Sequence, residues 1–218
     1  MKPLRNFFIA LIAIGSFAFI TLANAQEAPD VLIKRISNDV IEFAKADQEI
    51  HAGNQKRVLD LVEKKILPYV DFQRMTALAA GRYWRQASPE QQRQLIAEFR
   101  ALLVYTYSGA ISQIRDQGFQ LKPMQVGPSD TEVEVRSLVI PTRGEPMQLS
   151  YRLEKTPAGW RIFDVNVFGA WLVQTYKGTF ASEISKSGID GLIKTLSEKN
   201  KRLAGKNRSQ SALLESRL

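Results

Sequence analysis

Cysteine is absent from all 218 residues, and histidine occurs only once, as His51. Without cysteine the chain has no disulfides and no thiol nucleophile, so a hydrophobic core must hold the fold. A single histidine argues against a His-centred catalytic triad and against a zinc site. The chain also lacks a Gly-x-Ser-x-Gly elbow and a glycine-rich phosphate loop. We therefore predict no catalytic residues, no metal site and no cofactor.

Long uncharged stretches are missing everywhere except near the start of the chain. Lys2 and Arg5 precede an apolar stretch over residues 7–22, and Ala23-Asn24-Ala25 follows as a small-x-small cleavage site. The stretch is close to the shortest that can span a bilayer, so a retained anchor is the alternative. The cleavage site favours a signal peptide over residues 1–25. Because no cysteine is available for a lipid anchor, we expect an exported, soluble protein.

Acidic residues are outnumbered, with 22 Asp and Glu against 30 Lys and Arg. The formal charge of +8 falls to +6 without the predicted signal peptide, which carries two basic residues and no acidic one. Such a balance is compatible with nucleic acid, anionic lipid, an acidic partner protein or simple solubility. For an exported protein we expect no nucleic acid. Charge alone does not choose among the other three.

Helical periodicity occupies both ends of the mature chain. Asp71 is predicted to cap a short helix that ends at Gly81. Ser88, followed by Pro89 and Gln91, predicts a capping box at the start of a long helix. The predicted helices cover residues 28–50, 57–67, 71–81, 88–118, 171–185 and 189–203, with a break at Ser187-Gly188 between the last two. The polar tail, residues 204–218, is predicted to be disordered.

Between these helices the period of the apolar residues changes to two. Short turns separate the alternating runs, which predicts an antiparallel meander of four strands. The predicted strands are residues 119–126, 131–140, 147–154 and 160–167.

The last predicted strand has large apolar residues on both of its faces. Trp160 and Ile162 are predicted to point to one side, and Phe163, Val165 and Val167 to the other. A half-exposed antiparallel strand has one polar face, so this strand must be covered on both sides. A three-layer core and an apolar ligand pocket between sheet and helices both explain this pattern.

Asp164 is the one carboxylate in that apolar strand. It could act as a general base with a raised pKa, which would favour an enzyme. A buried carboxylate more often pairs with an arginine or caps backbone N–H groups, and this interpretation is preferred. A periplasmic chaperone or adaptor with an open groove is a further alternative. A small-solute receptor of two α/β lobes is disfavoured by the antiparallel pattern.

Three segments of the chain carry combinations of motifs that belong together. The first is Tyr69-Val70-Asp71-Phe72 with Gly81-Arg82-Tyr83-Trp84-Arg85-Gln86-Ala87-Ser88, Gln91-Gln92-Arg93, Phe99, Leu102-Leu103 and Thr106-Tyr107. The second is Gly159-Trp160-Arg161-Ile162-Phe163-Asp164-Val165 with Gly169, Leu172-Val173, Tyr176 and Phe180. The third is Gly188-Ile189-Asp190-Gly191-Leu192-Ile193 with Leu196. In this order, and together spanning residues 30–203, the segments resemble the MlaC (toluene-tolerance) family.

The resemblance implies a periplasmic phospholipid carrier that helps to maintain the lipid asymmetry of the outer membrane. Such a carrier shuttles diacyl phospholipid between an outer-membrane lipoprotein–porin complex and an inner-membrane ABC transporter with an MCE-domain ring. The implied fold is α+β, with a curved antiparallel sheet wrapped by N- and C-terminal helices around an apolar pocket. We assign this lipid-binding domain to residues 26–203 and expect a monomer whose only ligand is its lipid cargo.

The pocket interpretation predicts which apolar side chains contact the acyl tails. The candidates are Phe99, Leu103, Tyr107, Ile111, Val133, Val135, Leu149, Tyr151, Phe163, Val165, Val167, Val173 and Tyr176. The chain departs from many relatives at two places. It has Gly169-Ala170-Trp171 where they have Gly-Val-Ser, and Tyr176-Lys177 where they have Tyr-Arg. Trp171 is much larger than serine, so the pocket near it is expected to differ in shape.

Overall fold

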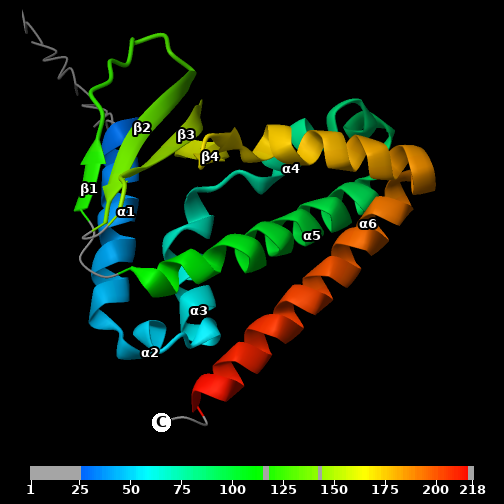
Figure 1. Ribbon diagram of the computed structural model, residues 1–218. Helices are drawn as coiled ribbons and strands as arrows, with labels where there is room; N and C mark the ends of the chain where they lie inside the picture. The colour runs from blue at the N-terminus through cyan, green and yellow to red at the C-terminus, as the bar shows by residue number, and fades with distance from the viewer. Residues whose placement is uncertain (1–25, 115–117, 142–143, 216–218) are drawn as a thin grey trace, which may run out of the picture.

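The computed structural model describes residues 26–114, 118–141 and 144–215 (Figure 1). The predicted signal peptide, residues 1–25, lies outside the described residues and stays a prediction. No helix of the described part is both long enough and apolar enough to cross a membrane.

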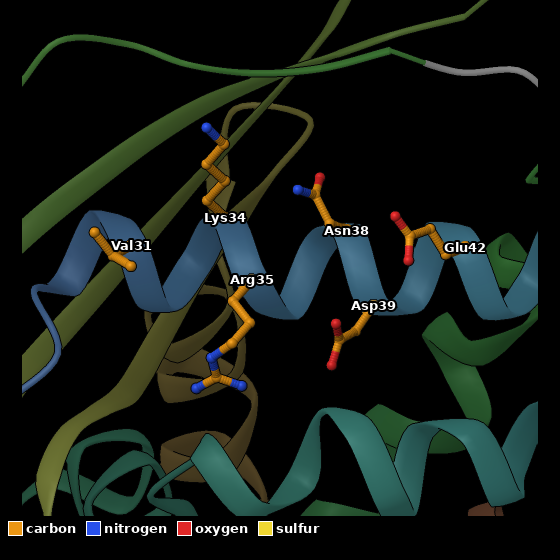
Figure 2. A pocket seen from close by; sticks show the side chains of 6 residues that line it. All are labelled: Val31, Lys34, Arg35, Asn38, Asp39 and Glu42. Atoms are coloured by element: carbon orange, nitrogen blue, oxygen red, sulfur yellow. The ribbon is translucent and has the colours of Figure 1, made fainter.

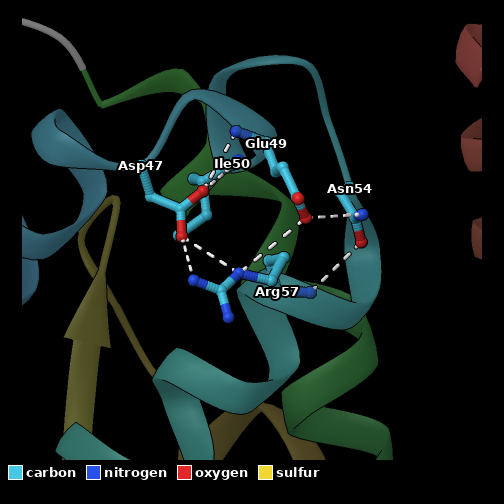
Figure 3. Close-up of polar contacts among 5 residues, drawn as sticks. All are labelled: Asp47, Glu49, Ile50, Asn54 and Arg57. Carbon is cyan, nitrogen blue, oxygen red and sulfur yellow. Dashed lines mark hydrogen bonds and ion pairs between the residues drawn. The ribbon is translucent and has the colours of Figure 1, made fainter.

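Three helices open the described chain: α1 (Pro29–Ala46), α2 (Gln48–His51) and α3 (Gln55–Lys65). The sequence predicted one helix over residues 28–50, but Asp47 divides it. Asp47 has an extended backbone, and its carboxylate accepts hydrogen bonds from the N–H groups of Glu49 and Ile50 (Figure 3). Aspartate favours this capping position over a helix interior, so the helix stops and restarts here.

The corner between α2 and α3 is held by a small polar network (Figure 3). Asn54 caps α3 by accepting a hydrogen bond from the backbone N–H of Arg57. The Arg57 guanidinium in turn donates to Asp47, with Nε 3.0 Å from Oδ2. Although burial opposes the charge on Asp47, the hydrogen bonds from Arg57 and from the N–H of Ile50 hold its pKa below the usual value.

A 3-10 turn (Leu67–Tyr69) leads to α4 (Phe72–Ala80), a 3-10 segment (Gly81–Gln86) and α5 (Pro89–Tyr107). The predicted caps are confirmed. Asp71 accepts from the N–H of Arg74 at 2.8 Å, and Ser88 forms the full capping box with Gln91.

The long helix is shorter than predicted, because α5 ends at Tyr107 and not at Gly118. A 3-10 segment, Ser108–Gln113, follows it. Ser108 and Gly109 are poor helix formers, and the buried Ser108 hydroxyl accepts a hydrogen bond from Gln55 of α3 at 2.9 Å. The chain is thereby tied to α3 where the helix stops.

The strands form one antiparallel meander in the order β1-β2-β3-β4-β5. They are β1 (Gly118–Leu121), β2 (Glu132–Ile140), β3 (Met147–Thr156), β4 (Gly159–Val167) and β5 (Ala170–Trp171). The predicted α+β class and the antiparallel meander are confirmed, but the sheet has five strands and not four. Because β5 is only two residues long, it is too short to give an alternating pattern in the sequence. The first strand, β1, ends at Leu121, whereas the sequence predicted that it continues to residue 126.

A β-bulge in β4 corrects the predicted faces of that strand. Leu153 of β3 pairs with Ile162, and the next β3 residue, Arg152, pairs with Asp164. Phe163 is therefore an extra residue without a partner, and the alternation of side chains shifts by one. As a result Ile162 and Val165 lie on the same face of the sheet, and the prediction that they point to opposite sides is wrong.

The C-terminal helix α6 (Leu172–Glu215) has two limbs separated by Gly188, whose φ of 74° and ψ of −178° are not helical. This confirms the predicted break. Figure 1 shows the limbs making a V with α5 running inside it. The second limb continues to Glu215, whereas the sequence predicted disorder from residue 204. Residues 204–215 contain alanine, leucine, lysine and glutamate and no proline, a composition compatible with helix.

Two clusters of buried side chains form the core. The sheet cluster packs α1–α3 under one face of the sheet, called here the inner face. It consists of Leu32, Ile33, Ile36, Val40, Ala44, Ile50, Val58, Leu61, Val135, Leu153, Trp160 and Ile162. The helical cluster packs α4, α5 and α6 together. It consists of Met75, Ala79, Leu95, Phe99, Leu102, Leu103, Leu172, Phe180, Ile184, Leu192 and Leu196.

Candidate functional site

Most of the predicted pocket residues on the strands share the inner face of the sheet. Cross-strand pairing places Val135, Tyr151 and Val165 in one row across β2, β3 and β4. The next row places Leu149 beside Val167. Directly paired residues of antiparallel strands point to the same face, as do residues two apart along a strand. The inner face therefore carries Val133, Val135, Leu149, Tyr151, Val165 and Val167 together.

This inner face is not uniformly covered. Val135 is fully buried in the sheet cluster, where α1 packs on β2. Leu149, Val165 and Val167 are only half-buried, although all three are aliphatic. Half-buried aliphatic side chains in a continuous group are what an apolar ligand would cover.

The helical candidates meet the same part of the sheet. Phe99, Leu103 and Tyr107 are spaced four residues apart on one side of α5, and Val173 and Tyr176 lie in the first turns of α6. The Phe99 and Tyr176 rings form an edge-to-face pair with centroids 4.9 Å apart. Five candidates from α5 and α6 and two from β4 belong to the helical cluster or pack against it, so the structure brings them together. These seven residues are Phe99, Leu103, Tyr107, Val165, Val167, Val173 and Tyr176.

The sheet and helical clusters meet at β4. Val165 packs against both clusters, as does Val70 in the loop before α4. Ile111, from the 3-10 segment after α5, joins the sheet cluster. Twelve of the thirteen candidates therefore lie on the inner face or beside one of the two clusters.

Phe163 is the exception. Its ring lies under the guanidinium of Arg74, 3.8 Å from the ring centroid, and Arg74 forms ion pairs with Glu132 and Glu154. These two glutamates alternate with Val133 and Leu153, so they belong to the outer face. The bulge thus separates Phe163 from the other candidates. No local pattern in the sequence predicts this bulge.

Two tyrosine hydroxyls near the site, those of Tyr151 and Tyr176, have raised pKa values. Burial raises the pKa of Tyr176 to about 12, and the neighbouring Tyr107 hydroxyl adds to this effect. Burial also raises the pKa of Tyr151, although hydrogen bonds with the hydroxyls of Ser137 and Ser37 oppose the shift. The site therefore offers apolar surface with a few uncharged polar groups.

Asp164 has a structural role that the sequence predicted. Its buried carboxylate accepts hydrogen bonds from the N–H of Val165 at 2.9 Å and from the N–H of Val173 at 3.0 Å. Arg152 lies 3.6 Å away. Burial raises the pKa of Asp164, and these three groups oppose the rise. The carboxylate therefore ties the start of α6 to β4.

Trp171, where the chain departs from many relatives, is connected to this carboxylate through Arg152. The guanidinium of Arg152 stacks on the Trp171 ring, 3.9 Å from a ring centroid. Such contact fixes both side chains at the edge of the sheet. Lys177, the other departure, is exposed on α6.

Two hollows elsewhere on the surface contain none of the predicted residues. The first, about 370 Å³, follows α1 and is lined by Val31, Lys34, Arg35, Asn38, Asp39 and Glu42 (Figure 2). Its charged lining suits water better than an acyl chain. The second, about 360 Å³, lies between the first described residues and the β3–β4 turn. Over the described ranges, no group of His, Asp and Glu side chains is arranged to hold a metal ion.

A family model described as MlaC protein matches residues 34–198. The toluene tolerance protein ttg2D of Pseudomonas putida is 24% identical over 85% of this chain and 85% of its own length. The intermembrane phospholipid transport system binding protein MlaC of Haemophilus influenzae is 22% identical over 86% of this chain and 89% of its own.

A solved structure gives a higher identity. The phospholipid-binding protein from Ralstonia solanacearum, solved in complex with a phospholipid, is 44% identical, with a TM-score of 0.78. The match covers 82% of this chain and 99% of that one.

Proposed function

Because the chain belongs to the MlaC protein family, we propose that it binds a diacyl phospholipid and carries it between the outer and inner membranes. The observation that supports this most strongly is the 44% identity with a protein whose structure contains a phospholipid. At this identity over most of both chains, the same fold and a similar apolar site are expected.

We propose that the acyl tails lie along the inner face of β3 and β4 and against the start of α6. The half-buried Leu149, Val165, Val167 and Val173 support this placement, because they are aliphatic and only partly covered by protein. The polar head group would remain near solvent. Tyr151 and Tyr176 would border the tails without introducing charge.

Energetics favour a carrier over a tight receptor. Two acyl chains hold on the order of 30 methylenes, and each contributes about 0.8 kcal/mol when it leaves water. The total would exceed the practical limit of about 18–21 kcal/mol for non-covalent affinity. A bilayer already shelters the tails, so transfer into an apolar site exchanges one apolar environment for another. The protein therefore needs a matched site and docking surfaces more than it needs strong binding.

The proposed location is the periplasm, which the predicted signal peptide over residues 1–25 and the family membership support. The proposed partners are an inner-membrane ABC transporter with an MCE-domain ring and an outer-membrane lipoprotein–porin complex. We propose that the domain of residues 26–203 acts as a monomer.

The prediction that the chain is not an enzyme agrees with its family membership. Asp164 is the carboxylate that would have served as the general base of an enzyme. It accepts hydrogen bonds from two backbone N–H groups and forms an ion pair with Arg152. Replacing it with asparagine should leave lipid binding intact.

Native mass spectrometry of protein purified from its own periplasm tests the proposal. We expect adducts with the masses of diacyl phospholipids, and the same lipids in an organic extract of the sample. Lipid-free protein in the spectrum, with an extract that contains no phospholipid, would contradict the proposed function.

A further inference from the structure

The turn between β4 and β5 is unusual in its backbone. Phe168 and Gly169 are its two central residues, because Val167 pairs with Ala170. Both have positive φ, 53° and 84°. Two-residue hairpins with positive φ at both positions strongly prefer Asn-Gly, since a large side chain in the left-handed region is strained. Among the described residues other than glycine, Phe168 alone has a positive φ.

The same side chain is unusually exposed. Phe168 is 81% exposed, whereas the other large apolar residues on the described surface reach at most 50%. An exposed phenylalanine gains nothing from burial, and at this position it also costs backbone strain. Neither the turn nor the core therefore explains its presence. A residue that is unfavourable for folding in two independent ways points to a function.

The base of the turn is tied to the sheet. Asp164 accepts a hydrogen bond from the N–H of Val173 just after the turn, and Trp171 of β5 pairs with Asn166 of β4. The stacking of Arg152 on Trp171 adds a third contact. The backbone that carries Phe168 is therefore anchored, and its side chain projects into solvent.

The turn also borders the proposed lipid site. Val167 immediately precedes Phe168, and Val173 follows it by five residues; both belong to the half-buried group. A surface beside the proposed lipid site is where a partner that exchanges lipid would have to dock.

We propose that Phe168 is a docking anchor that inserts into an apolar pocket of the protein partner with which lipid is exchanged. The inference rests on the proposed function. A protein pocket fits better than a bilayer for two reasons. A single buried aromatic can dominate a protein interface, and an anchored turn presents it with little reorganisation. Among the residues whose exposure is described, the other exposed large apolar side chains lie in α1, in α4 and before β2, so they form no broad apolar face around Phe168 for membrane insertion.

The test replaces Phe168 with asparagine, the residue that the turn prefers. Phe168→Asn should keep or raise the melting temperature, because it relieves backbone strain. It should leave the bound phospholipid unchanged. Its dissociation constant for the purified MCE-domain transporter in nanodiscs, or for the purified lipoprotein–porin complex, should rise about tenfold. Val31→Gln, at an exposed apolar position on α1, is the matched control and should change none of these quantities.

A photoreactive phenylalanine analogue at position 168 identifies the contact directly. Crosslinking to a protein subunit of either complex supports the anchor. Crosslinking only to lipid, in vesicles without partner protein, would overturn it in favour of a membrane contact. Unchanged affinity of Phe168→Asn for both complexes, or loss of lipid from the folded variant, would also overturn it. If the wild-type protein binds a complex but never carries lipid, the proposed carrier function is wrong, whereas the docking role of Phe168 is not contradicted by that result.

Discussion

The helical cluster and the inner face of the sheet use apolar side chains in different ways. In the helical cluster the rings of Phe99, Tyr176 and Phe180 contact one another at 4.9 to 5.9 Å, and both phenylalanines are fully buried. On the inner face of the sheet, burial falls from Val135, which is 0% exposed, to the half-buried Leu149. The centre of the helical cluster is closed by protein alone, whereas the inner face of the sheet around Leu149 is left partly uncovered.

The comparison separates fully buried from half-buried residues within the predicted pocket. A residue that protein atoms cover completely has little surface left for lipid, so we expect Phe99 to support the fold. A half-buried aliphatic residue on the uncovered face can contact lipid. We therefore expect substitutions in the two regions to affect different properties, stability in the first and lipid occupancy in the second.

Phe99→Ala should have the largest effect on stability. Removing a fully buried aromatic side chain leaves a cavity and costs about 3–5 kcal/mol of unfolding free energy. Chemical denaturation followed by circular dichroism measures this loss. A loss below about 1 kcal/mol, typical of surface positions, would show that Phe99 faces an open site instead.

The corner between α2 and α3 should give the next largest effect. Asp47→Ala removes the cap of α2 and the partner of Arg57, and should cost about 2 kcal/mol at neutral pH. Asp47→Asn, which keeps the cap but loses the charge, should cost less.

The pH dependence of this corner follows from the lowered pKa of Asp47. A carboxyl whose folded-state pKa is lowered contributes stability above its unfolded value, and the contribution disappears as pH falls through the folded value. The difference between wild type and Asp47→Asn should therefore shrink below about pH 4. A difference that stays constant down to acid pH would contradict the charge assignment.

Ser88→Ala should have a smaller effect, in the helical region. It removes the capping box of α5 and should cost about 1 kcal/mol. Thermal unfolding measures the shift, and Ser88→Asp, which can still cap, is the control. If both variants lose the same stability, the capping box is not the cause.

Features with local signals in the sequence were predictable. The caps at Asp71 and Ser88 and the helix break at Gly188 each depend on a few neighbouring residues, and all three are confirmed. The bulge at Phe163 and the short β5 depend on pairing between strands, which a single sequence does not display. The end of α5 at Tyr107 depends on the contact of Ser108 with α3, a tertiary effect of the same kind.

The candidate site was predictable to a similar degree. Alternation correctly assigned Leu149, Tyr151 and Val165 to one face, because strand periodicity is local. Alternation failed at Phe163, since the bulge shifts the period there. Periodicity also does not indicate how completely other protein atoms cover a side chain, so it could not distinguish buried Phe99 from half-buried Val173.

Lipid occupancy of tryptophan variants on β3 and β4 tests the central claim most directly. Leu149→Trp and Val165→Trp would fill the uncovered inner face, whereas Gln148→Trp places the same side chain on the outer face of β3. Native mass spectrometry should show phospholipid lost from the first two variants and retained by the third, with all three stable to within about 1 kcal/mol. Equal occupancy in all three folded variants would contradict a lipid site on this face.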